Sequence, residues 1–215
     1  MKIQLITIGL FITASCALAQ TMPANSPYLF PTFVKASVLQ KGGGTTDADM
    51  NYNTLTQEMM FMQNGEKMVM DLPETVDTIF IQGKKFIPAG KVYYDKLTDT
   101  KVALYEQHFN KLQLHGKNAD LDDQVNNTIT SSQGIRNTKT TTGNYSAVLA
   151  EGYTLNPQNT FWLQKGKSFY SADGVKKIVK VFPDKEQAIN DFIKTNKVDI
   201  TQADDLAKLV VFLNK

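Results

Sequence analysis

The fold is decided by the stretch from Met59 to Met70, which reads MMFMQNGEKMVM. Asn64-Gly65 at its centre is the preferred pair for a two-residue type I′ turn, because both positions of that turn need a positive φ. Apolar residues flank the pair on both sides. In the register that such a turn imposes, Phe61 lies opposite Met68 on one face of the hairpin. The stretch therefore predicts a tight antiparallel β-hairpin.

Methionine is concentrated around this hairpin, since six of the eight methionines lie between Met50 and Met70. Paired thioethers are ligands for cuprous ion. The predicted register, however, places Met60 and Met62 on the face opposite to Met59, so the pairs point in different directions. Methionine is also a flexible filler of hydrophobic cores. We therefore expect these residues to pack in the core and expect no cofactor.

Strand-like patterns extend in both directions from the hairpin. Upstream, Val34, Ala36 and Val38 share one face, Gly42-Gly43-Gly44 interrupts the pattern, and apolar and polar residues alternate from Asp47 to Tyr52. We therefore predict an antiparallel β region over residues 20–115. Its downstream strands are expected at Val76 to Ile81, Phe86 to Pro88, Val92 to Leu97 and Val102 to Phe109, with Leu112 and Leu114 closing the meander.

Residues 116–146 differ in composition, because Asn, Thr, Ser, Asp, Gly and Gln dominate them. Such a segment has too little apolar surface to order itself, so we expect a polar loop or linker, with room for a weak strand around Val125 and Ile129. Asp120, Asp122 and Asp123 offer oxygen ligands for calcium. The glycine and the terminal glutamate of an EF-hand loop are missing, which favours a solvated acidic loop.

Residues 147–215 are predicted to form a strand pair followed by a helical C-terminal region. The strand pair is expected at Phe161 to Gln164 and Ser168 to Ser171, after a β-like stretch from Ala147 to Leu155. Apolar residues then recur at helical spacing in three segments. The helices are expected to be capped by Asp173, to begin again at Asp184, and to start a last time at Thr201-Gln202-Ala203-Asp204, which is similar to a capping box.

The N-terminus has the pattern of a secretory leader. Lys2 precedes a mostly apolar stretch that is too short to span a bilayer, and Ala17-Leu18-Ala19 is typical of a signal-peptidase site, so we expect residues 1–19 to be a signal peptide. Thr13-Ala14-Ser15-Cys16 offers a second reading, in which Cys16 is lipidated and anchors the chain. The sequence thus predicts export to the periplasm or cell surface, with the free form favoured.

Composition excludes several classes of function for the processed chain. Cys16 is the only cysteine, so cleavage after Ala19 removes any disulfide, thiol nucleophile or cysteine metal site. Without Lys2, 22 basic residues face 21 acidic ones. Such a balance does not favour nucleic-acid binding, and no later segment is apolar for long enough to cross a membrane. Nucleophile elbows, phosphate loops and zinc signatures are also absent from the sequence.

The two histidines and a few carboxylates are the remaining candidates for chemistry. His108 shares strand phase with Leu104 and Leu112, which predicts a half-buried histidine with a local hydrogen-bond partner, whereas His115 is expected to be exposed. Their spacing does not favour joint binding of a metal. Glu58 and Glu106 are the carboxylates that a hydrolase could use, but no motif marks them.

Aromatic residues suggest a surface for sugar rings. A stacking platform could be formed by Trp162, Phe161, Phe169, Tyr170 and Tyr153. Phe161 and Trp162, however, are neighbours on one strand and must point to opposite faces. At most half of the set is therefore expected on one surface. Asp77-Thr78-Ile79 is similar to an O-glycosylation sequon, although it lies in a predicted strand, where an enzyme would have poor access.

Two segments carry a family resemblance. The N-terminal segment comprises Tyr28-Leu29-Phe30-Pro31 and residues 51–59 (NYNTLTQEM). The C-terminal segment comprises Phe182-Pro183-Asp184-Lys185 and residues 192–197 (FIKTNK). Both resemble uncharacterised exported proteins of Gram-negative Bacteroidetes. The resemblance implies a cell-envelope location and assigns no catalytic or ligand residues.

The fold expected from all these patterns is α+β, with a mainly antiparallel, sheet- or barrel-like N-terminal region, a C-terminal strand pair and about three short helices. The function expected is that of a non-catalytic envelope protein that binds a partner protein or a glycan through its β-surface. The alternative is a carboxylate-dependent hydrolase acting on envelope or dietary glycans.

Overall fold

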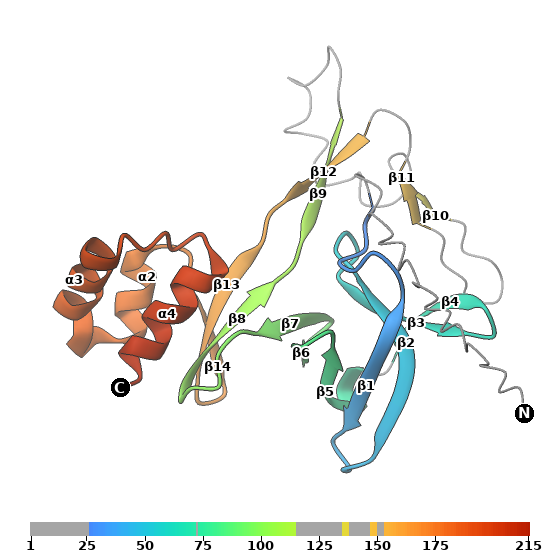
Figure 1. Ribbon diagram of the computed structural model, residues 1–215, viewed down its shortest axis with the longest axis horizontal. Helices are drawn as coiled ribbons and strands as arrows, with labels where there is room; N and C mark the ends of the chain where they lie inside the picture. Colours follow the sequence, from blue (N-terminus) through green and yellow to red (C-terminus); the bar gives the residue numbers. More distant parts are fainter. Residues whose placement is uncertain (1–25, 72, 115–134, 138–146, 150–152) are drawn as a thin grey trace, which may run out of the picture.

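A computed structural model describes residues 26–71, 73–114, 135–137, 147–149 and 153–215 of the chain. Within these residues, ten antiparallel strands form one open sheet, four more strands form two short pairs, and three α-helices follow at the C-terminal end (Figure 1). The expected α+β class is thus confirmed. Among the described residues, no helix combines the length and apolar character needed to cross a membrane. The predicted leader and Cys16 lie outside the described part.

The decisive hairpin forms as predicted. Strands β3 (Glu58–Gln63) and β4 (Glu66–Val69) pair with Phe61 opposite Met68. Asn64 and Gly65 adopt φ values of 52° and 82°, as a type I′ turn requires. The hairpin continues through β2 (Thr45–Asn53) to β1 (Val34–Gln40) at the inner end of this four-strand group.

A meander extends the sheet from the other side of β1. A short 3-10 turn, η1 (Pro73–Thr75), leads into β5 (Val76–Ile81), which pairs with β1 and leaves β4 as an edge strand. The strands that follow in sequence then add on one by one. They are β6 (Lys84–Ala89), β7 (Val92–Lys96) and β8 (Val102–Gln107).

The predicted C-terminal strand pair completes the same sheet. Strand β13 (Thr160–Lys165) pairs with β8, and β14 (Ser168–Ser171) forms the second edge. The sequence predicted the pair itself but not its attachment to β8. The reason is that pairing between segments more than fifty residues apart leaves no mark in local periodicity.

Strands β8 and β13 also continue into a projecting two-stranded ribbon (Figure 1). In this ribbon β9 (Asn110–Leu114) pairs with β12 (Tyr153–Pro157), and the backbone N–H of Gln158 donates to the carbonyl of Phe109 across the break. Residues 135–137 (β10) and 147–149 (β11) form the other short pair. Most of the predicted linker, including Asp120, Asp122, Asp123, Val125 and Ile129, lies outside the described residues, as does His115.

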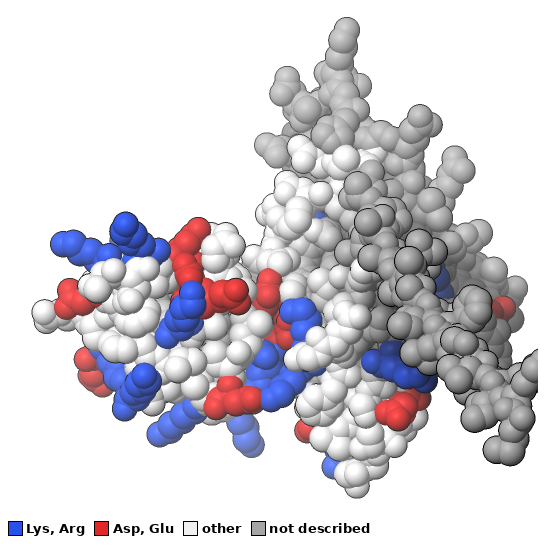
Figure 2. Space-filling model, viewed as in Figure 1, with Lys and Arg blue, Asp and Glu red and all other residues white. Residues whose placement is uncertain are grey.

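Three helices cover one face of β8 and β13. They are α2 (Val175–Val181), α3 (Glu186–Asn196), which follows the 3-10 turn η3 (Pro183–Lys185), and α4 (Ala203–Leu213). On the face shown in Figure 2, basic and acidic side chains are interspersed over this helical end. The buried residues between helices and sheet include Leu104, Phe161, Leu163, Ile178, Ile189, Leu206, Leu209 and Val210.

The predicted helix caps are wrong at two helices. Asp173 does not cap α2, because its carboxylate pairs with Lys177 and the N-cap is Gly174, whose φ is 111°. Thr201 does not close a capping box at α4, because its hydroxyl donates to Asp199 at 2.6 Å. In both places the side chain interacts with another side chain, and no side-chain hydrogen bond caps the helix.

A second core fills the N-terminal half of the same sheet face. It contains the predicted methionines Met50 and Met59, both fully buried, which confirms their packing role. The other buried members are Phe30, Ala36, Val38, Tyr52, Val76, Ile79, Ile81, Phe86 and Tyr93. Two apolar cores therefore lie side by side on one sheet face, one under the helices and one among the N-terminal strands.

The hairpin yields a direct test of the turn assignment. We expect Gly65→Ala to lower the free energy of unfolding by roughly 1–2 kcal/mol, because φ at this position is +82° and a Cβ is unfavourable there. Gly42→Ala is the matched control, since Gly42 has no positive φ and open space around it. Urea unfolding of both variants measures the difference. Equal stabilities would contradict the turn.

Candidate functional site

A row of directly opposed residues crosses the sheet between the two cores. It runs from Ile79 on β5 through Phe86, Asp95 and Glu106 to Phe161 on β13. The row is apolar at both ends and acidic in the middle. Lys84 and His108 lie two residues along their strands from members of the row and so share its face. We call Lys84, Asp95, Glu106 and His108 the charged cluster.

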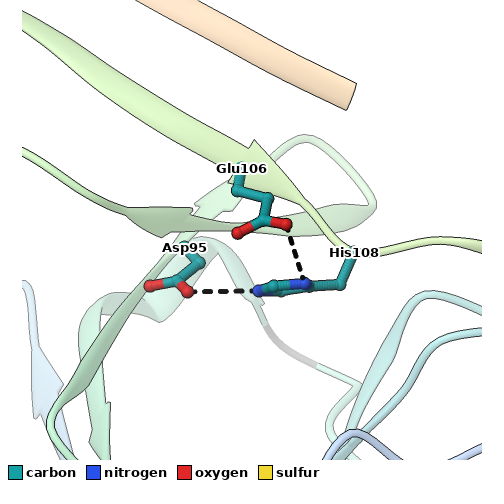
Figure 3. Close-up of side chains that lie close together, drawn as sticks. All are labelled: Asp95, Glu106 and His108. Carbon is teal, nitrogen blue, oxygen red and sulfur yellow. Dashed lines mark hydrogen bonds and ion pairs between the residues drawn. The ribbon is translucent and has the colours of Figure 1, made fainter. Parts of the chain in front are cut away.

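The imidazole of His108 lies between the two carboxylates (Figure 3). Its Nε2 is 3.1 Å from Oδ2 of Asp95, and its Nδ1 is 3.5 Å from Oε1 of Glu106. Lys84 donates from Nζ to the same Oδ2 of Asp95 at 2.5 Å. Asn159 donates from Nδ2 to Oε1 of Glu106 at 2.7 Å. Every member of the cluster therefore has a polar partner.

The cluster is buried, so its charges must balance. Asp95, Glu106 and His108 are only 1%, 7% and 5% exposed. Two carboxylates opposed on neighbouring strands repel each other, and unpaired buried charges are costly. Lys84 and His108 are the basic side chains that lie within ion-pair distance of these carboxylates. Burial alone would raise the pKa of Asp95, but the hydrogen bonds and charges of His108 and Lys84 hold it below its ordinary value.

Aromatic rings enclose one side of the cluster. The ring of Phe86 lies 6.0 Å from the His108 ring and stacks on Tyr52 at 5.5 Å, while Tyr52 meets His108 edge-on at 6.5 Å. Burial raises the pKa of the Tyr52 hydroxyl far above its ordinary value, so Tyr52 borders the charged cluster as an uncharged side chain. The plane of the imidazole is thus fixed by packing as well as by hydrogen bonds.

The opposite face of the sheet carries a different group of side chains. Tyr94 and Trp162 stack with ring centroids 5.7 Å apart, and Phe169 meets both Tyr94 and Tyr105 edge-on at 5.3 Å. We call these four residues the aromatic face. Tyr105 and Trp162 alternate along their strands with Leu104, Phe161 and Leu163, which pack under the helices. Trp162 and Phe169 are half-buried, whereas Tyr94 and Tyr105 are buried.

Polar groups fix the orientation of the aromatic face. The indole Nε1 of Trp162 donates to Oε1 of Gln107 at 3.1 Å and to the hydroxyl of Thr160 at 3.2 Å. The hydroxyl of Tyr105 donates to Oε1 of Gln164 at 2.6 Å. Amide and hydroxyl groups therefore border the rings and hold them in place.

The structure brings together some of the predicted residues and separates others. His108 is more buried than predicted, and its hydrogen-bond partner is Asp95 on another strand and not a local residue. Lys84 in turn donates to Asp95 from a third strand. Glu106 belongs to the cluster, whereas Glu58 begins β3, outside it. Sequence reasoning missed Asp95, although one signal marks it: an acidic residue stands at a core-facing position between Tyr93 and Leu97.

The expected aromatic platform is split as predicted. Phe161 packs under the helices, and Trp162 with Phe169 lies on the opposite face. Tyr170 is 46% exposed, and Tyr153 belongs to the projecting ribbon. Tyr94 and Tyr105 were missed, because their contact with Trp162 and Phe169 depends on the long-range pairing of β8 with β13.

Comparisons of the chain with protein-family models, with curated proteins and with solved structures each found no match. Function is therefore inferred from the chemistry of the charged cluster and the aromatic face.

Burial of the cluster predicts unequal costs for two aspartates that are otherwise alike. Asp95 and Asp99 each lie within ion-pair distance of two basic side chains, but the Asp99 side chain is 64% exposed. We expect Asp95→Asn to lower the free energy of unfolding by about 3 kcal/mol, as loss of one partner from a buried pair does. Asp99→Asn, the control, should cost under about 1 kcal/mol.

Chemical denaturation of both variants, followed by far-ultraviolet circular dichroism, measures these costs. A loss at Asp95 no larger than that at Asp99 would show that the charged cluster does not hold the two cores together.

Proposed function

We propose that this chain is an exported cell-envelope protein that binds a glycan, without catalysis, through its aromatic face. The observation that carries the proposal is the half-buried ring of Trp162, stacked on Tyr94 and tethered by hydrogen bonds to Gln107 and Thr160. An apolar ring held in one orientation and bordered by amides suits the apolar face and the hydroxyl groups of a sugar.

The hydrogen-bonding groups around the rings favour a sugar over a purely apolar ligand. Oε1 of Gln164 accepts from Tyr105, while its Nε2 has no hydrogen-bond partner within the described residues and can donate to a hydroxyl. Gln107 is held by Trp162, Thr160 and Gln57. The rings contribute apolar contact, and the amides contribute directional hydrogen bonds. Because these side chains are already held in place, little side-chain entropy is lost on binding.

The sheet supplies the rigidity that such a surface needs. A row of directly opposed residues crosses β7, β8, β13 and β14, and its members are Lys96, Tyr105, Trp162 and Ser171. The helices pack against the other face of these strands, so the aromatic face is mounted on a buried core. A surface built on paired strands presents its rings in one arrangement, which is the condition for specific stacking.

Export is supported by the leader-like residues 1–19. We expect the intact mass of the protein recovered from the envelope fraction to correspond to a chain that begins at Gln20. A mass that corresponds to a chain beginning at a lipidated Cys16 would show that the protein is anchored and not free. A full-length mass from the cytosol would contradict export.

Hydrolysis by carboxylates is the second candidate, and one observation favours it: Asp95 and Glu106 are opposed, with His108 between them. Their oxygens are, however, engaged by Lys84, His108 and Asn159. Turnover of an envelope or dietary glycan that disappears in Glu106→Gln, while glycan binding persists, would establish this function instead.

Trp162 provides the test of glycan binding, because it is the only tryptophan in the chain. We expect its fluorescence to change on titration with the matching soluble glycan from a panel of envelope and dietary polysaccharides. In affinity electrophoresis, Trp162→Ala should weaken retardation by roughly tenfold or more, since a loss of about 1.4 kcal/mol of contact energy corresponds to a factor of ten.

Tyr170→Ala is the matched control for this experiment. Tyr170 lies on the same hairpin and is more exposed than Trp162, but it points to the other side of the sheet. Equal weakening by both substitutions, or retardation by no glycan of the panel, would overturn the proposal. The aromatic face would instead bind a protein partner if an envelope protein cross-links to the wild type but not to Trp162→Ala, and if the substitution does not change glycan binding.

A further inference from the structure

The charged cluster lies on the sheet face opposite the aromatic face, so its chemistry is independent of glycan binding. We propose that Asp95, Glu106 and His108 form a site for one divalent transition-metal cation of the Zn²⁺ class, and that Lys84 leaves the cluster when the cation enters. The site rests on the donor set, the charge of its ligands and the exposure of Lys84.

The donor set suits such a cation. One ligand atom from each of Asp95, Glu106 and His108 can be chosen so that all three lie within 4.8 Å of one another. Two carboxylate oxygens and one imidazole nitrogen are typical ligands of Zn²⁺, and three protein ligands leave a fourth position for water. All three residues belong to or directly follow paired strands, so their backbones are already fixed.

The charge of the ligand set also suits a divalent cation. Asp95 is paired with Lys84 and His108, and Glu106 lies beside His108 and Asn159. A divalent cation bound to two carboxylates and a neutral imidazole gives a total charge of zero once Lys84 has left. The cation would therefore replace the ammonium group of Lys84 as the positive charge beside the carboxylates.

Lys84 is the member of the cluster that can leave. Its side chain is 35% exposed, whereas that of Asp95 is 2% exposed. A lysine has a flexible stem, so its ammonium group can move from Asp95 into solvent without moving the backbone. Its departure frees Oδ2 of Asp95, the oxygen that also faces Nε2 of His108.

The present geometry shows which movement the cation requires. The two ring nitrogens of His108 face different carboxylates, and one cation binds only one of these nitrogens. With the cation at Nε2 and Asp95, the side chain of Glu106 has to turn toward it. Asn159 already holds Oε1 of Glu106, and such a hydrogen bond to a ligating carboxylate is typical of the groups around bound metals.

The test uses untagged protein that has been freed of metal with a chelator. We expect isothermal titration with Zn²⁺ at pH 7.5 to show one site per chain, and Co²⁺ to give the visible absorption of a low-coordinate complex. His108→Gln and Asp95→Asn should each weaken binding by at least tenfold. Circular dichroism of each variant establishes that it is folded.

Lys84→Met separates a metal site from a purely structural ion pair, because it removes the competitor and leaves all three ligands. We expect this variant to bind Zn²⁺ several-fold more tightly than the wild type. Lys85→Met is the matched control, since Lys85 pairs with the exposed Asp99 and should leave affinity unchanged.

Two results would overturn the metal site. One is the absence of Zn²⁺ binding and of the Co²⁺ spectrum in both the wild type and Lys84→Met. The other is binding that His108→Gln does not weaken. Neither result affects the glycan proposal, whose test depends on Trp162 on the other sheet face.

Discussion

The opposition of Asp95 and Glu106 across neighbouring strands is the constraint on which the rest of the structure depends. Directly opposed carboxylates repel each other in a buried sheet, so basic side chains must be brought to them. Lys84 and His108 fill this role, and they come from β6 and from the end of β8. The pairing of β7 with β8 is therefore stable only if β6 is also in place. This requirement ties the N-terminal core to the core under the helices.

The strict alternation of side chains in the sheet separates the two kinds of chemistry. Glu106 and its neighbour Tyr105 are adjacent in sequence, yet one belongs to the charged cluster and the other to the aromatic face. The helices cover only one side of β8 and β13, and the half-buried rings of Trp162 and Phe169 lie on the other side. The glycan site and the metal site that we propose therefore lie on different faces of the sheet.

Local patterns in the sequence predict the strands better than their assembly. The Asn64-Gly65 pair predicts its hairpin and register, because turn geometry is set by neighbouring residues. The phase of His108 with Leu104 predicts a half-buried histidine, and the structure buries it more fully. Its partner Asp95 lies thirteen residues away on another strand. The periodicity of a sequence does not show which strands pair, so the charged cluster and the contacts within the aromatic face could not be predicted. The helix caps failed because Asp173 and Thr201 have competing partners.

Retention of charge in the middle of an apolar row has a physical rationale beyond stability. Apolar residues of similar volume at Asp95 and Glu106 could stabilise the fold as well as the charges do. Apolar contacts are not directional, whereas the ion pairs and hydrogen bonds of the charged cluster form in only one register. A slip of one residue places Asp95 beside Tyr105, on the aromatic face, and leaves Lys84 and His108 without their partners. The cluster therefore specifies the register, and the register sets the positions of Trp162, Tyr94 and Tyr105 on the opposite face.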